Sequence, residues 1–129
     1  MKLSTLNTDI RNNIKDYIIF KPKTKKELKK AVDIWCKNKD DALNYYGHIS
    51  NWNTSLIIDM SYLFYRKLIF NFNDNINNWD VSSVTNMKEM FKNAILFNQP
   101  LNSWDVSSVI DMTSMFENAS KFNQNINSW

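Results

Sequence analysis

The sequence predicts an α/β repeat solenoid in which each unit of about 25 residues contributes one short helix and one short parallel strand. Three observations indicate this fold. Tryptophans recur at spacings of 27, 25 and 25 residues, other apolar residues recur in phase with them, and the first 46 residues lack the repeat. A fixed period of this length is typical of a stacked array, because one unit cannot bury its apolar face alone. The tryptophans are Trp52, Trp79, Trp104 and Trp129.

The repeat divides the chain into two parts. Residues 1–46 are expected to form a helical N-terminal cap, and residues 47–129 the repeat array. The array begins with a half unit, because Ile49 occupies the phase of Ile76 in the first full unit. The predicted parts of the array are the half unit 47–52 and the units 52–79, 79–104 and 104–129.

Five apolar positions recur in every unit and are expected to form the core. They hold tryptophan, methionine, two phenylalanines, and isoleucine or leucine. The predicted core residues are Trp52, Met60, Phe64, Phe72, Ile76, Trp79, Met87, Phe91, Phe97, Leu101, Trp104, Met112, Phe116, Phe122, Ile126 and Trp129.

A helix is predicted from the first methionine of each unit. In the second unit the apolar residues fall at i, i+3, i+4 and i+7, which is one stripe of an α-helix; they are Met87, Met90, Phe91 and Ala94. A residue suited to an N-cap precedes the first methionine of each unit. These residues are Asp59, Asn86 and Asp111.

A short strand is predicted around residues 101–105, paired in parallel with the same segment of the neighbouring units. Asparagines flank the inward positions of this segment, and we expect them to lie in an exposed row that forms the contact face. They are Asn75, Asn77, Asn102 and Asn127. A second set is expected to form an internal ladder that satisfies backbone groups between units, with simple surface polarity as the alternative. It comprises Asn73, Asn98 and Asn123.

Helical patterns also run through the first 46 residues, which carry a net charge of +5 against −2 for the rest of the chain. One apolar face extends from Leu6 to Tyr17, and Thr24 with Glu27 forms a capping box that opens a second helix. A third helix is expected at residues 41–46, closed by Gly47. The basic stretch 21–30 lies on the polar face of the second helix, so a solvated surface is favoured over a nucleic-acid site.

Catalytic and cofactor chemistry finds no support in the sequence, so we expect neither an enzyme nor a bound cofactor or metal. His48 is the only histidine, and Gly47 is the only glycine, which excludes a glycine-rich phosphate loop. Cys36 is the only cysteine and is expected to be buried filler. Asp80 and Asp105 fit turn bonding better than a carboxylate site. No apolar run is long enough to span a membrane.

The repeated pattern W(D/N)xSxxxxMxxMFxxAxxFNQxIxxW, which covers residues 47–129, resembles the BspA-type leucine-rich-repeat family. The match is to its 25-residue mycoplasma-lipoprotein-like subtype, found on bacterial surface lipoproteins and in giant viruses of protists. The resemblance implies a leucine-rich-repeat-like solenoid that acts in adhesion or protein binding, without catalytic residues. No signal peptide is seen, so we expect a location in the cytoplasm, a virion or the host-cell interior.

We therefore expect a non-enzymatic protein-interaction or adhesion module with an unknown protein partner. One alternative is an intracellular adaptor whose N-terminal helices recruit a second protein. Another is a basic helix that binds nucleic acid or an anionic surface through residues 21–30. The last unit is expected to expose Phe122, Ile126 and Trp129 and to allow self-association.

Overall fold

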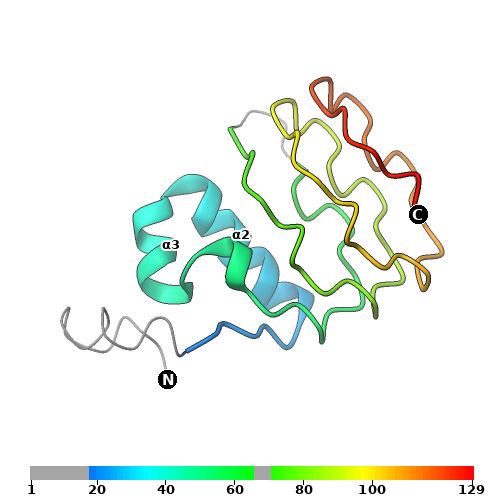
Figure 1. Ribbon diagram of the computed structural model, residues 1–129. Helices are drawn as coiled ribbons and strands as arrows, with labels where there is room; N and C mark the ends of the chain where they lie inside the picture. The colour runs from blue at the N-terminus through cyan, green and yellow to red at the C-terminus, as the bar shows by residue number, and fades with distance from the viewer. Residues whose placement is uncertain (1–17, 66–70) are drawn as a thin grey trace.

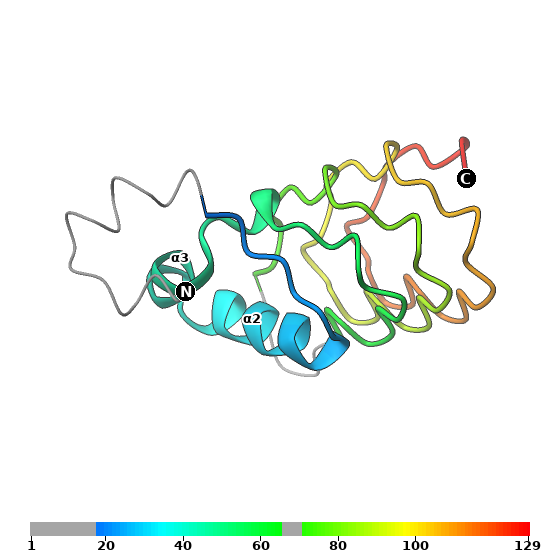
Figure 2. The same ribbon diagram turned by 90° about the horizontal axis from the view of Figure 1, so that it is seen from below.

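The computed structural model describes residues 18–65 and 71–129. Two helices, α2 (Lys25–Lys37) and α3 (Lys39–Tyr46), lie at one end, followed by a short 3₁₀ turn, η2 (Ile49–Asn51). The repeats then form a row of coils that leads away from the helices to the C-terminal residue (Figures 1 and 2). We call these coil 1 (52–79), coil 2 (79–104) and coil 3 (104–129).

Helix α2 confirms the capping signal in the sequence. The Thr24 side chain accepts a hydrogen bond from the Glu27 amide, and the Glu27 carboxylate accepts one from the Lys23 amide at 2.9 Å. These bonds satisfy amides that have no partner within the helix. The buried face consists of Leu28, Ala31, Val32 and Trp35.

Asn38 joins the two helices, since it is the C-cap of α2 and the N-cap of α3. Its side chain accepts from the Asp41 amide at 3.1 Å. Helix α3 begins at Lys39, earlier than the sequence predicts, and ends at Tyr46. Gly47 is its C-cap, with a φ of 72° that favours glycine. The helix expected between Leu6 and Tyr17 lies outside the described residues.

The coils turn at corners made by asparagine and aspartate. At corner A the side-chain oxygen accepts from the amide two residues later, as Asp105 does from Ser107 at 3.0 Å. Corner B repeats this arrangement, as between Asp111 and Thr113 at 2.9 Å. Such Asx turns reverse the chain locally without a helix or strand. Corner A comprises Asn53, Asp80 and Asp105, and corner B comprises Asp59, Asn86 and Asp111.

Neighbouring coils are joined by backbone hydrogen bonds after corner B. The amides of Met60 and Phe64 in coil 1 donate to the carbonyls of Asn86 and Met90 in coil 2, both at 2.9 Å. Coil 2 donates to coil 3 in the same way, for example from Met87 to Asp111. Two isolated parallel bridges, Asp59 with Asn86 and Asn86 with Asp111, mark the start of this ladder.

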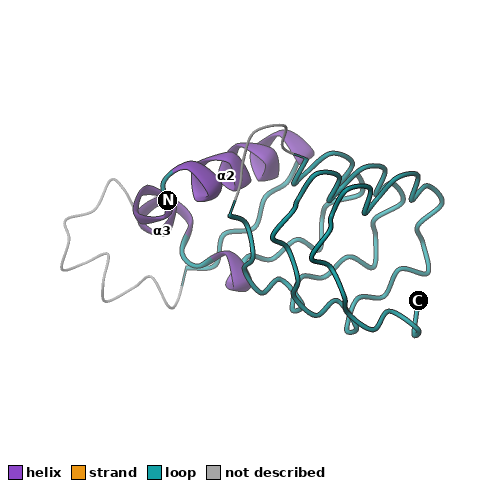
Figure 3. Ribbon diagram, turned by 90° about the horizontal axis from the view of Figure 1, so that it is seen from above, coloured by secondary structure: helices purple, strands orange, loops and turns teal. Residues whose placement is uncertain are grey.

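The prediction of an α/β repeat solenoid is wrong, first because no described unit contains a helix (Figure 3). Each predicted helical stretch has at least one residue with left-handed backbone. In coils 1 and 2 some amides of the stretch donate to the next coil and others bond three residues back, and in coil 3 the bonds within the stretch also reach three residues back rather than four. L-residues in the left-handed conformation interrupt an α-helix. The residues concerned are Tyr62, Glu89, Asn93, Ser114 and Asn118, with φ between 52° and 62°.

The predicted parallel strands are also wrong, because the described residues contain no β-strand. In the segment around Leu101 the backbone turns instead, and the Trp104 amide donates to the Leu101 carbonyl at 3.2 Å. The same turn joins Trp79 to Ile76 and Trp129 to Ile126. Because the tryptophan amides donate within a coil, they are unavailable for a β-ladder between coils.

Two columns of phenylalanine rings form the centre of the coils. Phe91 stacks on Phe64 at a centroid distance of 5.3 Å and on Phe116 at 5.5 Å, nearly parallel in both cases. The second column contains Phe72, Phe97 and Phe122. Within coil 2 the two columns meet at Phe91 and Phe97, 4.4 Å apart. Aromatic contacts of this kind add to the area that the rings bury.

Burial of the predicted core residues follows their place along the row of coils. Those of coils 1 and 2 are buried. Those that belong to coil 3 alone, Met112, Phe116, Phe122, Ile126 and Trp129, are half-buried. Helices α2 and α3 cover the other end of the row, where Trp35 and Tyr46 contact Trp52.

Candidate binding surface

The four asparagines predicted as a contact face lie along the segment that follows the second phenylalanine of each unit. Asn75, Asn102 and Asn127 are exposed, and Asn77 is half-buried. The Asn77 amide nitrogen donates to the Asn102 side-chain oxygen at 3.2 Å. The structure therefore brings Asn77 and Asn102 together across two coils, while binding at these positions stays a prediction.

Two of these residues are also part of the coil framework. The Asn75 side-chain oxygen accepts from the Asn77 amide at 2.8 Å and so makes a corner turn. The Asn77 side-chain oxygen accepts from the Ser103 amide of the next coil at 3.0 Å. A substitution at either position would therefore disturb the backbone as well as the surface.

Asn102 and Asn127 line an open groove of about 440 Å³ between coils 2 and 3. We call it the amide groove. Its wall holds amides, one hydroxyl and one proline ring, and none of its lining side chains titrates near neutral pH. The lining residues are Pro100, Asn102, Gln124, Asn125, Asn127 and Ser128.

The predicted ladder of asparagines contacts the groove through Gln124, which lines it. The Asn98 amide donates to the Asn73 side-chain oxygen at 2.8 Å, and the Asn123 amide donates to that of Asn98 at 2.9 Å. The Gln124 amide nitrogen adds a bond to the Asn98 side chain at 2.9 Å. The hydrogen-bonded ladder is confirmed, but it is not internal, because Asn73 and Asn123 are exposed.

Carboxylates recur at corner A, where their chemistry supports turns. The Ser107 hydroxyl and amide hydrogen bonds lower the pKa of Asp105. For Asp80 the Ser82 hydroxyl and amide lower the pKa, against burial and the nearby charge of Asp105, which raise it. The prediction that these aspartates serve turn bonding is thereby confirmed.

A family comparison covers most of the chain described above. Residues 28–129 match the family described as "Mycoplasma protein of unknown function, DUF285". The chain belongs to this family. No curated protein and no solved structure matches the chain.

The DUF285 match begins at the first buried residue of α2 and includes α3 and all three coils. Contacts between α2 and coil 1 fit this extent. The Trp35 indole donates to the Asp74 carboxylate at 2.9 Å, and the Lys25 ammonium donates to Ser61 at 2.6 Å. The helices and the coils of this DUF285 chain are therefore linked by specific polar bonds.

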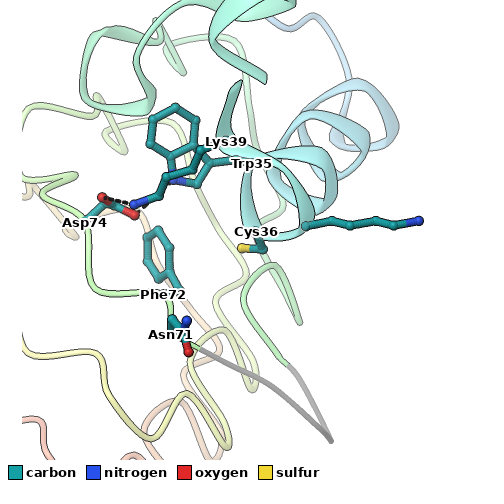
Figure 4. A pocket seen from close by; sticks show the side chains of 7 residues that line it. Trp35, Cys36, Lys39, Asn71, Phe72 and Asp74 are labelled. Atoms are coloured by element: carbon teal, nitrogen blue, oxygen red, sulfur yellow. Dashed lines mark hydrogen bonds and ion pairs between the residues drawn. The ribbon is translucent and has the colours of Figure 1, made fainter. Parts of the chain in front are cut away.

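A cavity of about 310 Å³ lies at this junction of the DUF285 chain (Figure 4). The Asp74 carboxylate at its edge pairs with both the Trp35 indole and the Lys39 ammonium. Because these polar groups bind one another, we interpret them as a structural contact between the helices and coil 1. The cavity is lined by Trp35, Cys36, Lys37, Lys39, Asn71, Phe72 and Asp74.

The basic stretch 21–30 of the DUF285 chain is partly engaged within the fold. Lys25 pairs with Asp59 at 3.3 Å, and Lys29 pairs with Asp33 at 2.7 Å along α2.

Neither α2 nor any other helix in the described part of the chain has the length and apolar character of a membrane span.

The chain has one histidine, His48, and one cysteine, Cys36, and the structure places each of them in the framework of the fold. His48 Nδ1 accepts from the Ser50 amide at 3.2 Å and so caps η2. Cys36 is half-buried beside the junction cavity rather than fully buried. Among the described residues no cluster of three or more histidine, cysteine or carboxylate side chains offers a metal site.

An exposed apolar row was missed in the sequence. Leu56, Ile58 and Ile110 are exposed. Leu56 and Ile58 flank the buried Ile57, and Ile110 follows the half-buried Val109. The signal was present as the alternation of Leu56, Ile57 and Ile58, in which only the middle side chain is buried.

Proposed function

We propose that this protein is a non-enzymatic protein-binding module and that the amide groove contacts the partner. The observation that carries the proposal is the convergence of Asn102 and Asn127, from two successive coils, on one open groove. The fold holds both on a framework of backbone and side-chain hydrogen bonds, which limits the entropy lost on binding.

The lining chemistry suits a polypeptide without charge. A side-chain amide offers both a donor and an acceptor, so it can pair with the amide and carbonyl of an extended backbone. Pro100 adds an apolar contact within the same groove. Because no lining side chain is ionised near neutral pH, binding here should depend little on salt.

The finer relationship to BspA-type repeats remains a proposal that rests on the shared pattern of tryptophan, methionine and phenylalanine. We propose it at the level of sequence ancestry and of an adhesion or protein-binding role. The adaptor alternative would require residues 1–46 to keep a partner of their own. The bonds of Lys25 and Trp35 to coil 1 favour one unit instead.

The face of coil 3 is a second proposed contact, between copies of this chain. Met112, Phe116 and Phe122 are half-buried there, whereas their counterparts in coil 2 are fully buried. After corner B each coil donates amides to the next coil, whereas between the two corners it accepts from the next coil, so this face presents both donors and acceptors. We expect the half-buried apolar side chains to supply the main contact between two such faces, which predicts weak, concentration-dependent association in sedimentation experiments.

Affinity capture with the full chain tests the groove. The bait is compared with an Asn102→Ala/Asn127→Ala variant and with Asn44→Ala, an exposed control on α3. We expect one partner protein that survives high salt, is lost with the double variant and is kept with the control. Retention of the same partner by the double variant would refute the groove as the contact.

A further inference from the structure

The exposed apolar row lies on the stretch between corner A and corner B. The Thr85 amide donates to the Ile58 carbonyl and the Ile110 amide to the Thr85 carbonyl, both at 2.8 Å. These bonds hold Ile58, Thr85 and Ile110 side by side across the three coils. Ile58 is 63% exposed and Ile110 is 89% exposed.

The fold does not need these side chains for its core. Ile57 and Val84, their neighbours on the inward side, are buried. Leu56 is also exposed, two residues before Ile58, and widens the apolar area on coil 1. Single exposed apolar residues are ordinary. Here Ile58 and Ile110 lie in register on either side of Thr85, and exposed apolar area gathered in one place is typical of interaction sites.

Carboxylates lie at both ends of this stretch. At corner B, Asp59 pairs with Lys25, and the charge of Lys88 acts on Asp111. At corner A, Asp80 and Asp105 accept hydrogen bonds from serines, and no described lysine is paired with either. Corner A therefore carries two like charges on successive coils without a described cation beside them.

The apolar row and corner A lie within reach of one short peptide. Asp105 and Ile110 are five residues apart, which spans at most about 17 Å. The Val109 amide donates a hydrogen bond to the Val106 carbonyl at 3.0 Å. This turn folds the stretch back and shortens it further. A cationic side chain placed there would relieve the repulsion between the two aspartates.

We propose that this face binds a segment of a partner protein in which apolar side chains alternate with lysine or arginine. The apolar side chains of the partner cover Ile58, Thr85 and Ile110, and its cations meet Asp80 and Asp105. This surface is separate from the amide groove, so a partner can occupy one without the other.

Three short fluorescent peptides test the proposal by anisotropy with the full chain. They alternate valine with lysine, valine with glutamate, and serine with lysine. We expect measurable binding only for valine with lysine, and weaker binding as salt rises. Equal binding of the serine–lysine peptide would reduce the effect to charge alone and overturn the proposal.

Matched variants locate the site. Ile58→Ser/Ile110→Ser should lower the affinity for the valine–lysine peptide about tenfold or more, since two exposed apolar contacts are lost. Asp80→Asn/Asp105→Asn should weaken it and remove most of the salt dependence, while the turns persist, because Asn53 makes the same turn at 3.0 Å.

The controls are Ile95→Ser, which removes an isoleucine that is 50% exposed outside the row, and the double variant of the amide groove. Neither should change peptide binding. A loss with Ile95→Ser as large as that with Ile58→Ser/Ile110→Ser would contradict the assigned site. Peptide binding that fails while capture through the amide groove succeeds would refute this inference and leave the proposed function standing.

Discussion

The indole Nε1 of Trp104 donates a hydrogen bond to the carbonyl oxygen of Ile76 at 3.0 Å, and both residues are buried. Trp79 makes the equivalent bond to Ile49 at 2.8 Å. Each tryptophan therefore satisfies its own buried donor and also ties one coil to the preceding one. This dual role explains why the residue at this phase is tryptophan rather than another aromatic.

Replacing Trp104 tests both roles. Trp104→Ala should lower the free energy of unfolding by roughly 3–5 kcal/mol, as for other large aromatic deletions in cores. Trp104→Phe keeps an aromatic ring but removes the indole donor, and the Ile76 carbonyl retains only its bond from the Trp79 amide. It should therefore cost about 0.5–1.5 kcal/mol, the usual net contribution of one hydrogen bond. Urea denaturation measures both changes.

Lys121→Ala is the surface control for this pair, because Lys121 is exposed. A Trp104→Phe variant as stable as this control would show that the indole hydrogen bond contributes nothing. A Trp104→Ala variant as stable as the control would contradict the burial of Trp104 between coils.

The asparagine ladder should contribute measurably at Asn98. Its side-chain oxygen accepts from both Asn123 and Gln124, so Asn98→Ala removes two bonds at once. We expect a loss of about 1 kcal/mol. Asn127→Ala should change stability by less than about 0.5 kcal/mol, as is usual for surface positions. Equal effects of the two substitutions would show that the ladder does not stabilise the fold.

The corner aspartates predict a pH dependence of stability. Serine hydrogen bonds lower the pKa of Asp80 and Asp105 in the folded state. A lowered pKa means that the folded state binds fewer protons, so stability rises with pH. The contribution is complete above the unfolded pKa of about 3.9. It is lost as the pH falls through the lower folded pKa values.

Substitution with asparagine isolates this effect. Asp80→Asn/Asp105→Asn keeps the turns but removes both titrating groups, so its urea midpoint should fall less than that of the natural chain on acidification. Asp105→Ala should lower the midpoint at neutral pH as well, because the turn loses its acceptor. Parallel acid declines in the natural chain and the double asparagine variant would rule out the corner carboxylates as the cause.

Periodicity predicts the core of coils 1 and 2, but it does not predict the half-burial of the same positions in coil 3 or the burial of Ile57, Val81 and Val84. The 25-residue spacing places Phe91 and Phe116 at one phase, and the structure stacks their rings. The same holds for the buried face of α2, where Thr24 and Glu27 supply an unambiguous start signal. Both predictions depend on apolar burial, which a sequence pattern reports directly.

The shape of each unit could not be predicted from the same pattern. Met87, Met90 and Phe91 fit the spacing of a helix, but a coil of tight turns also buries them. The sequence predicts Asn86 as an N-cap, and its side chain does accept a hydrogen bond from the Lys88 backbone amide. Asx turns and N-caps use the same residues and bonds, so local sequence did not separate them.

The sequence predicts an exposed row of four asparagines, of which only two line the amide groove, and it predicts neither the groove nor the apolar row. Asn102 and Asn127 were chosen because they flank inward residues, and the structure places both on the amide groove. Ile110 was missed because apolar residues are expected inside. Its exposure follows only from the way in which the coils are aligned by hydrogen bonds.

The central claim is that each repeat is a coil of turns bonded to its neighbours and contains no helix. Ser114 tests it most directly, because it is exposed and has a φ of 53° in coil 3. In a left-handed position glycine is more stable than alanine by about 1 kcal/mol. Within a helix alanine is more stable than glycine by about the same amount. We predict that Ser114→Gly has a higher free energy of unfolding than Ser114→Ala, and the opposite order would contradict the account.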